Sequence, residues 1–91
     1  MKIKVIYDNL SRSKAWGMAH SDGNKIVLEK KLKGKKHLEI INHELLHILF
    51  PEMSEEEVIE KSITLTNILW KEGYRRVDNS NTILLQNGKK S

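Results

Sequence analysis

The chain contains no cysteine, which excludes disulfides and thiolate metal sites. It also has one proline and few aromatic side chains, namely two Trp, two Tyr and one Phe. None of these aromatics lies within the lysine-rich stretch at residues 30–36, so the sequence shows no platform on which nucleic-acid bases could stack. No apolar run approaches the length that crosses a bilayer. A small domain without disulfides often depends on a bound metal or a partner for its stability.

The 91 residues are enough for one domain, and we interpret residues 1–91 as a single unit. The net charge of +4 comes mainly from basic residues at 30–36, 75–76 and 89–90. Runs of this kind are usually solvated, so nucleic-acid binding is the less favoured interpretation. The first five residues alternate lysine with apolar side chains, which is not the apolar core of a signal peptide. We therefore expect a soluble, cytoplasmic protein without a membrane segment.

The most informative stretch is His43-Glu44-Leu45-Leu46-His47, which reads H-E-x-x-H inside a helical pattern. Residues four apart lie on one face of a helix, so both imidazoles can bind the same metal ion. Many hydrolytic zinc sites use two histidines and a carboxylate and leave one position for water. Glu44 can accept a proton from that zinc-bound water. The motif therefore predicts a zinc-dependent metallopeptidase that hydrolyses peptide bonds, with His43 and His47 as metal ligands and Glu44 as the catalytic base.

The helix that carries this motif is expected from about residue 36 to residue 50, where Pro51 ends it. Its apolar residues cover almost the whole circumference, which is typical of a largely buried helix. His43, Glu44 and His47 are then polar groups in an apolar setting. Such groups need partners, and a bound metal ion supplies one.

A second helix is expected from Ser54 to about residue 71 or 72, with Gly73 as its stop. Ser54 is a good N-cap, and Glu57 lies at the third helical position, so the two form a capping box. The expected apolar face has Ser62 and Thr66 at its centre. It consists of Val58, Ile59, Ile63, Leu65, Leu69 and Trp70.

Three consecutive acids begin that helix, and a helical wheel distinguishes them. Glu55 projects onto the middle of the apolar face, Glu56 onto its margin and Glu57 toward water. A carboxylate in the middle of a packing face is costly unless it is paired or coordinated. Glu55 is therefore the predicted third zinc ligand, with Glu56 as the fallback. The alternative explanation for Glu55 is a first-turn acid that the helix dipole favours.

The N-terminal half predicts a small sheet. Residues 2–7 indicate one strand, and residues 15–20 and 25–29 indicate a hairpin whose turn contains Asp-Gly and Asn. Residues 10–14 form a loop or one helical turn. Gly17 suggests a bulge or a close approach of the backbone. If the first hairpin strand lies at the sheet edge, its free backbone groups can pair with an extended peptide.

Toward the C-terminus, residues 74–77 and 82–86 are expected to form short strands around a polar turn at 78–81, followed by a frayed tail. The expected fold class is α+β. A small antiparallel sheet of about three strands packs on two helices, the first of which carries the H-E-x-x-H motif.

A strand hairpin, an H-E-x-x-H helix with His43 and His47, and a second helix with a glutamate together resemble gluzincin-type zinc metallopeptidases. The nearer resemblance is to minimal single-domain bacterial and phage proteins related to ImmA/IrrE-like peptidases. In those proteins an I-x-L strand precedes the motif, as residues 26–28 do here. Their third ligand commonly reads E-x-x-A followed by a polar residue, and residues 55–59 depart from that pattern. The resemblance covers about residues 17–70 and implies a proteolytic zinc site with a peptide or protein substrate.

Two questions follow: whether the protein turns over a substrate, and which residue would stabilise the oxyanion. The small size and the lack of an evident specificity subdomain are also compatible with a catalytically silent, zinc-stabilised protein-interaction module. A peptidase also needs a group that stabilises the oxyanion of its transition state. By residue type alone, the candidates are His20, Tyr74 and Arg75.

Overall fold

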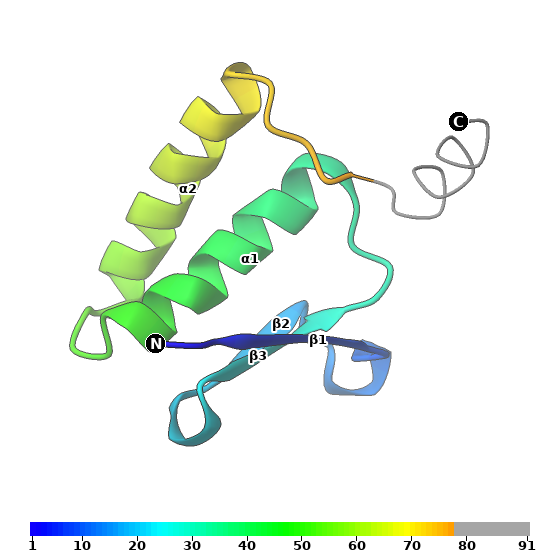
Figure 1. Cartoon of the computed structure of the whole chain (residues 1–91), viewed down its shortest axis with the longest axis vertical. Helices are drawn as coiled ribbons and strands as arrows, with labels where there is room; N and C mark the ends of the chain where they lie inside the picture. The colour runs from blue at the N-terminus through cyan, green and yellow to red at the C-terminus, as the bar shows by residue number, and fades with distance from the viewer. Residues whose placement is uncertain (78–91) are drawn as a thin grey trace.

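The structure is a computed structural model, and it describes residues 1–77. Its fold is α+β, as the sequence predicted: helix α1 lies between a three-stranded sheet and helix α2 (Figure 1). Short 3-10 turns at Ser11–Ser13 and Ser21–Gly23 connect the strands. The strands are β1 (Lys4–Asp8), β2 (Gly17–His20) and β3 (Lys25–Glu29), and the helices are α1 (Gly34–Leu49) and α2 (Glu55–Lys71).

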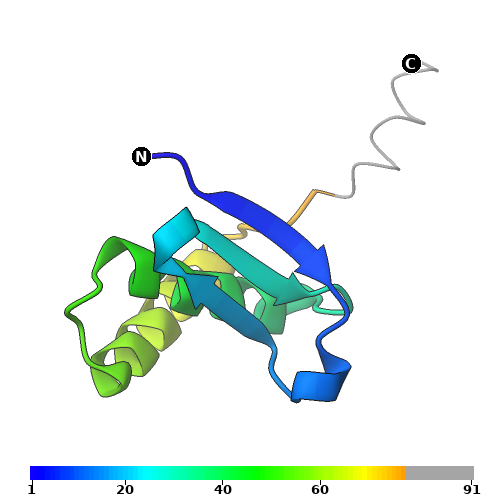
Figure 2. The same cartoon turned by 90° about the horizontal axis from the view of Figure 1, so that it is seen from below.

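The sheet is mixed, and the prediction of an antiparallel sheet was wrong for one strand pair. β2 and β3 form the expected antiparallel hairpin, whereas β1 lies parallel to β3 on its other side (Figure 2). Asp8 at the end of β1 pairs with Glu29, and Gly17 at the start of β2 pairs with Leu28. The short connection from Asp8 to Gly17 therefore crosses the end of β3 and reverses the chain, which makes β1 parallel to β3.

One face of the sheet packs against α1 and forms the core. Ile26 and Leu28 of β3 are fully buried there and contact Leu32 and Ile48. Each fully buried aliphatic side chain of this kind contributes roughly 1.5–3 kcal/mol to stability. Because α1 is anchored by this core, its other faces are held in a fixed orientation.

Helix α1 begins two residues before the expected start and ends next to the proline. Gly34 opens it with a φ of +60°, a left-handed conformation that glycine adopts without strain. Phe50 follows the last helical residue with φ −131° and ψ 72°, outside the helical region that a following proline disfavours. Three of the four buried residues of the helix lie in its second half, at Glu44, Leu46 and Ile48, whereas Leu49 and Phe50 are about half exposed, at 49% and 51%.

Helix α2 begins with the predicted capping box. The Ser54 hydroxyl accepts a hydrogen bond from the Glu57 N–H at 3.2 Å, and the Glu57 carboxylate accepts one from the Ser54 N–H at 3.3 Å. Its predicted apolar face was too broad, because α2 packs mainly on α1. Only the centre of that face is buried, at Val58, Ser62 and Thr66, while its flanks at Ile59, Ile63 and Leu65 are exposed.

The chain after α2 does not form the predicted strand at residues 74–77. Gly73 ends the helix with a φ of +94°. The Arg75 guanidinium then stacks on Trp70, 3.4 Å from the ring centroid, and donates to the carbonyls of Trp70 and Tyr74. These contacts hold the segment at the end of α2, where it runs back toward the start of α1 (Figure 1).

The predicted turn at 78–81, strand at 82–86 and tail at 87–91 lie outside the described residues. Within residues 1–77, neither helix has the length and apolar character needed to span a membrane.

Candidate metal centre

The side chains of His43, His47 and Glu55 converge at the junction of the two helices. The two imidazole Nε2 atoms are 3.2 Å apart, and Glu55 Oε1 lies 2.9 Å from His43 Nε2 and 3.3 Å from His47 Nε2. The sequence predicted these three residues as the metal-binding group. The structure brings all three together.

Local chain geometry explains this convergence. His43 and His47 are one turn apart near the end of α1, so their rings project from the same face. A tight corner then reverses the chain, closed by a 3.0 Å hydrogen bond from the Met53 N–H to the Phe50 carbonyl. Glu55 is the first residue of α2 and returns directly to the two imidazoles.

The donor set fits a divalent metal ion. Two imidazole nitrogens and one carboxylate oxygen are typical zinc donors, and bonds of about 2.0–2.1 Å in a tetrahedral site place ligand atoms roughly 3.3 Å apart. The three separations observed here are 2.9 to 3.3 Å. The group can therefore hold a metal ion.

The neighbouring acids of α2 do not join this group. Glu57 is engaged in the capping box with Ser54. Glu56 is exposed and is not among the residues whose ligand atoms converge. The Glu55 side chain is itself 60% exposed, which leaves the open side of the group accessible to solvent.

Glu44 lies beside this group but is deeply buried, with only 8% of its surface exposed. Burial raises the pKa of the Glu44 carboxyl above its ordinary value, and the imidazoles of His43 and His47 act in the opposite direction. Within residues 1–77, no hydrogen bond or ion pair joins this carboxylate to another group. A buried carboxylate without a protein partner is costly, and it is typical of a functional position.

Glu29 provides the comparison, because it is an equally buried glutamate with a structural role. Its carboxylate accepts hydrogen bonds from the N–H groups of Leu10 at 2.7 Å and Lys31 at 2.8 Å. These two bonds hold the pKa of Glu29 below its ordinary value. They also fix the connection that crosses the end of β3. The two buried glutamates thus differ in what satisfies them: backbone donors satisfy Glu29, and nothing in the described chain satisfies Glu44.

A cavity of about 540 Å³ opens beside Glu44 and His47. Its opposite wall is β2 and the following residue, from Met18 to Ser21. Within residues 1–77, β2 is an edge strand, as the sequence suggested, because β3 pairs with only one of its sides. The cavity therefore has both His47 and the edge strand β2 in its walls.

The three candidates for oxyanion stabilisation line two different cavities. His20 lines the cavity beside Glu44. Tyr74 and Arg75 line a different cavity near the start of α1, together with Tyr7 and His37. In that second cavity the Tyr7 hydroxyl and His37 Nε2 are 2.8 Å apart, and burial lowers the pKa of His37. Of the three, only His20 is near the metal-binding group.

No pattern in the sequence indicated the role of Glu29. For Gly17 the sequence indicated a bulge or a close approach of the backbone, without naming the group that approaches. The expected close approach at Gly17 is real. A Cβ built on Gly17 would lie 3.0 Å from Glu44 Cγ and 3.1 Å from Glu44 Oε2. The signal in the sequence was a glycine within a strand, but its partner could not be identified before the fold was known.

Comparison with protein-family models, with curated proteins and with solved structures finds no match to this chain.

Proposed function

We propose that this protein is a zinc-dependent metallopeptidase that hydrolyses peptide bonds in a peptide or protein substrate. The observation that carries the proposal is the buried carboxylate of Glu44, which has no hydrogen-bond partner within residues 1–77 and lies next to three convergent metal donors. A structural glutamate in such a position would be expected to have partners, as Glu29 has.

The residues divide the chemistry between them. His43, His47 and Glu55 hold the metal ion, which when bound acts as a Lewis acid and activates water. Glu44 accepts a proton from the attacking water and then transfers it to the leaving amine.

The free edge of β2 supports a peptide as the substrate. An extended peptide can add to an exposed strand through main-chain hydrogen bonds. Such a peptide would run along the wall of the cavity that contains Glu44 and His47. His20, on the same wall, is the candidate for stabilising the developing oxyanion.

The test compares Glu44→Gln with the wild-type protein in a peptide-library cleavage assay, with the metal content of both measured. Gln preserves size and hydrogen bonding but cannot accept a proton, so we expect full metal content and a loss of about a hundredfold or more in rate. Glu39→Gln, on the same helix but outside the convergent group, is the matched control. Absence of cleavage by the zinc-loaded wild-type protein across the library would refute the peptidase proposal.

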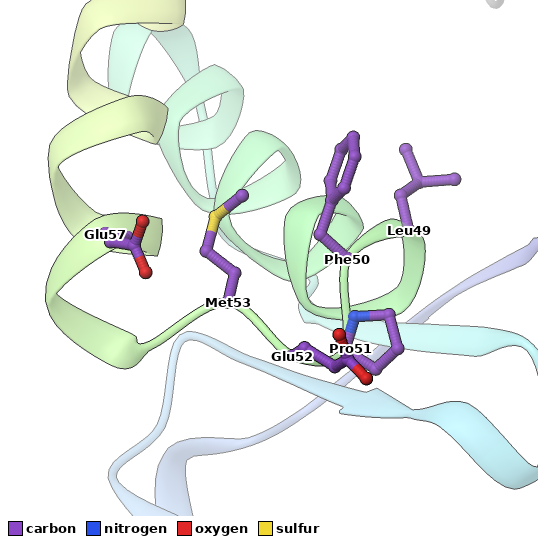
Figure 3. A pocket seen from close by; sticks show the side chains of 6 residues that line it. All are labelled: Leu49, Phe50, Pro51, Glu52, Met53 and Glu57. Atoms are coloured by element: carbon purple, nitrogen blue, oxygen red, sulfur yellow. The ribbon is translucent and has the colours of Figure 1, made fainter.

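A second candidate is the catalytically silent, zinc-stabilised interaction module, and one surface favours it. The corner between α1 and α2 exposes Leu49 and Phe50 beside a cavity of about 470 Å³ that Met53 also lines (Figure 3). Exposed apolar clusters often mark protein-binding surfaces. This candidate predicts that Glu44→Gln retains partner binding in full, whereas Phe50→Ser loses it.

A further inference from the structure

Gly17 lies where β2 approaches α1 most closely. A Cβ atom at this position would come within 3.0 Å of Glu44 Cγ and within 3.1 Å of Glu44 Oε2. It would also come within 3.0 Å of Ile40 Cγ2. Real Cβ atoms essentially never approach other heavy atoms more closely than this, so a side chain here requires its neighbours to move.

The backbone conformation does not explain the glycine. Positive φ values in the described chain occur at Gly34 and Gly73 among the glycines, and not at Gly17. Any residue could adopt the strand conformation of Gly17, which pairs regularly with Leu28 in the β2–β3 ladder. The requirement for glycine therefore comes from the space that Glu44 and Ile40 occupy.

The neighbours have little freedom to move away. Ile40 packs against the hydrophobic core, and Glu44 is 92% buried, the complement of its 8% exposure. The backbone of β2 is fixed by its hydrogen bonds to β3. Packing against the core holds Ile40, whereas no hydrogen bond within residues 1–77 holds the Glu44 carboxylate, so a Cβ at residue 17 would displace the carboxylate first.

We propose that Gly17 is a positioning residue for Glu44. Its bare backbone forms the wall against which the carboxylate rests, so the close packing of β2 on α1 determines where the Glu44 carboxylate lies in the cavity that it shares with His47. The inference rests on the proposed function, because it assigns to Glu44 a task that needs precise placement. It adds that the sheet, and not only the helix that carries the motif, determines the geometry of the base.

The contact predicts a selective defect in Gly17→Ala. The three nearest atoms to the added methyl group belong to Glu44 and Ile40 and not to His43, His47 or Glu55, so zinc affinity should stay unchanged. Misplacement of the base by a few tenths of an ångström should lower kcat by up to about tenfold with little change in KM, less than the hundredfold that a 1 Å misplacement can cost. Gly23→Ala is the matched control, because a Cβ there meets only the flexible Lys25 side chain at 4.0 Å.

A second readout is independent of turnover. Acetohydroxamate chelates zinc and can donate a hydrogen bond to a correctly placed carboxylate. We expect its affinity for the zinc-loaded protein to fall about tenfold in Gly17→Ala and in Glu44→Gln, the scale of one hydrogen bond to a charged group. In the double variant the two losses should not add, because both remove the same interaction.

The outcomes separate this inference from the peptidase proposal. If the wild-type protein cleaves nothing, the peptidase proposal fails, yet the hydroxamate cycle still tests whether Gly17 acts through Glu44. Additive losses in the double variant, or loss of zinc by Gly17→Ala, would overturn the positioning role. If Gly17→Ala does not fold, Gly17→Ala with Ile40→Ala relieves the contact with Ile40, retains the contact with Glu44 and undergoes the same measurements.

Discussion

Residues of one type perform different tasks in this protein according to what surrounds them. Glu29 and Glu44 are both buried, but backbone N–H groups lower the pKa of the first and burial raises the pKa of the second. The first arrangement stabilises the fold at neutral pH. The second is a cost to stability that an acid–base role would explain.

The pKa of Glu29 leads to a prediction about acid stability. The unfolded chain binds a proton at Glu29 at higher pH than the folded chain does, because the Leu10 and Lys31 N–H groups favour the carboxylate. The stability that Glu29 contributes is therefore present above the ordinary pKa of glutamate and is lost as the pH falls through the lower, folded-state value. Glu29→Gln should be less stable near neutrality and should show a shallower loss of stability in acid.

Urea unfolding of the metal-free protein from neutral to acidic pH checks this prediction. The metal is removed because protonation of its ligands in acid would release it and so lower the free energy of unfolding independently of Glu29. Glu60→Gln, an exposed glutamate on α2, is the control and should follow the wild-type curve. Parallel pH profiles for wild type and Glu29→Gln would show that the two hydrogen bonds do not act on the carboxylate in this way.

The three acids that open α2 allow a sharper test at residue scale. Glu55→Gln should weaken zinc binding strongly, because Glu55 Oε1 is the donor between the two imidazoles. Glu57→Gln should leave zinc affinity unchanged and change stability little, because the glutamine amide oxygen can still accept the Ser54 N–H in the capping box. Glu56→Gln should change neither quantity. Zinc titrations and thermal unfolding of the three variants decide, and a loss of affinity confined to Glu56→Gln would contradict the assignment.

At the scale of elements, the sequence was most informative where the signals are local. Pro51, the Ser54–Glu57 capping box and Gly73 placed the ends of the helices to within two residues. The hairpin could be predicted equally well from its turn residues. The direction of β1 could not be predicted, because the alternation of its side chains is the same whether it runs parallel or antiparallel to β3.

The candidate site also has one part that local sequence patterns predict and one part that depends on the fold. The grouping of His43, His47 and Glu55 follows from the helical repeat and from one short corner, so a helical wheel was sufficient to predict it. The contact between Gly17 and Glu44 joins segments 27 residues apart, counting from 17 to 44, and depends on how closely the sheet packs on α1. No pattern within either segment contains that information.

At the scale of the whole molecule, the metal-binding group has a structural consequence as well as a chemical one. Helix α2 packs mainly on α1 and leaves the flanks of its apolar face exposed, so its position depends chiefly on α1. The three donors come from both helices, two from α1 and one from α2. A bound metal ion therefore crosslinks the last element of the described fold to the helix that the sheet anchors.

This crosslink predicts a large effect of metal removal. An ion that binds the folded chain and not the unfolded one, present at a hundredfold excess over its Kd, stabilises by about 2.7 kcal/mol. For a domain of this size that corresponds to a rise in Tm of roughly 10–20 °C. Differential scanning calorimetry with zinc and with a chelator should show this shift in the wild-type protein and in Glu44→Gln, but not in His47→Ala. Equal melting temperatures with and without zinc in the wild-type protein would mean that the ion does not join the two helices.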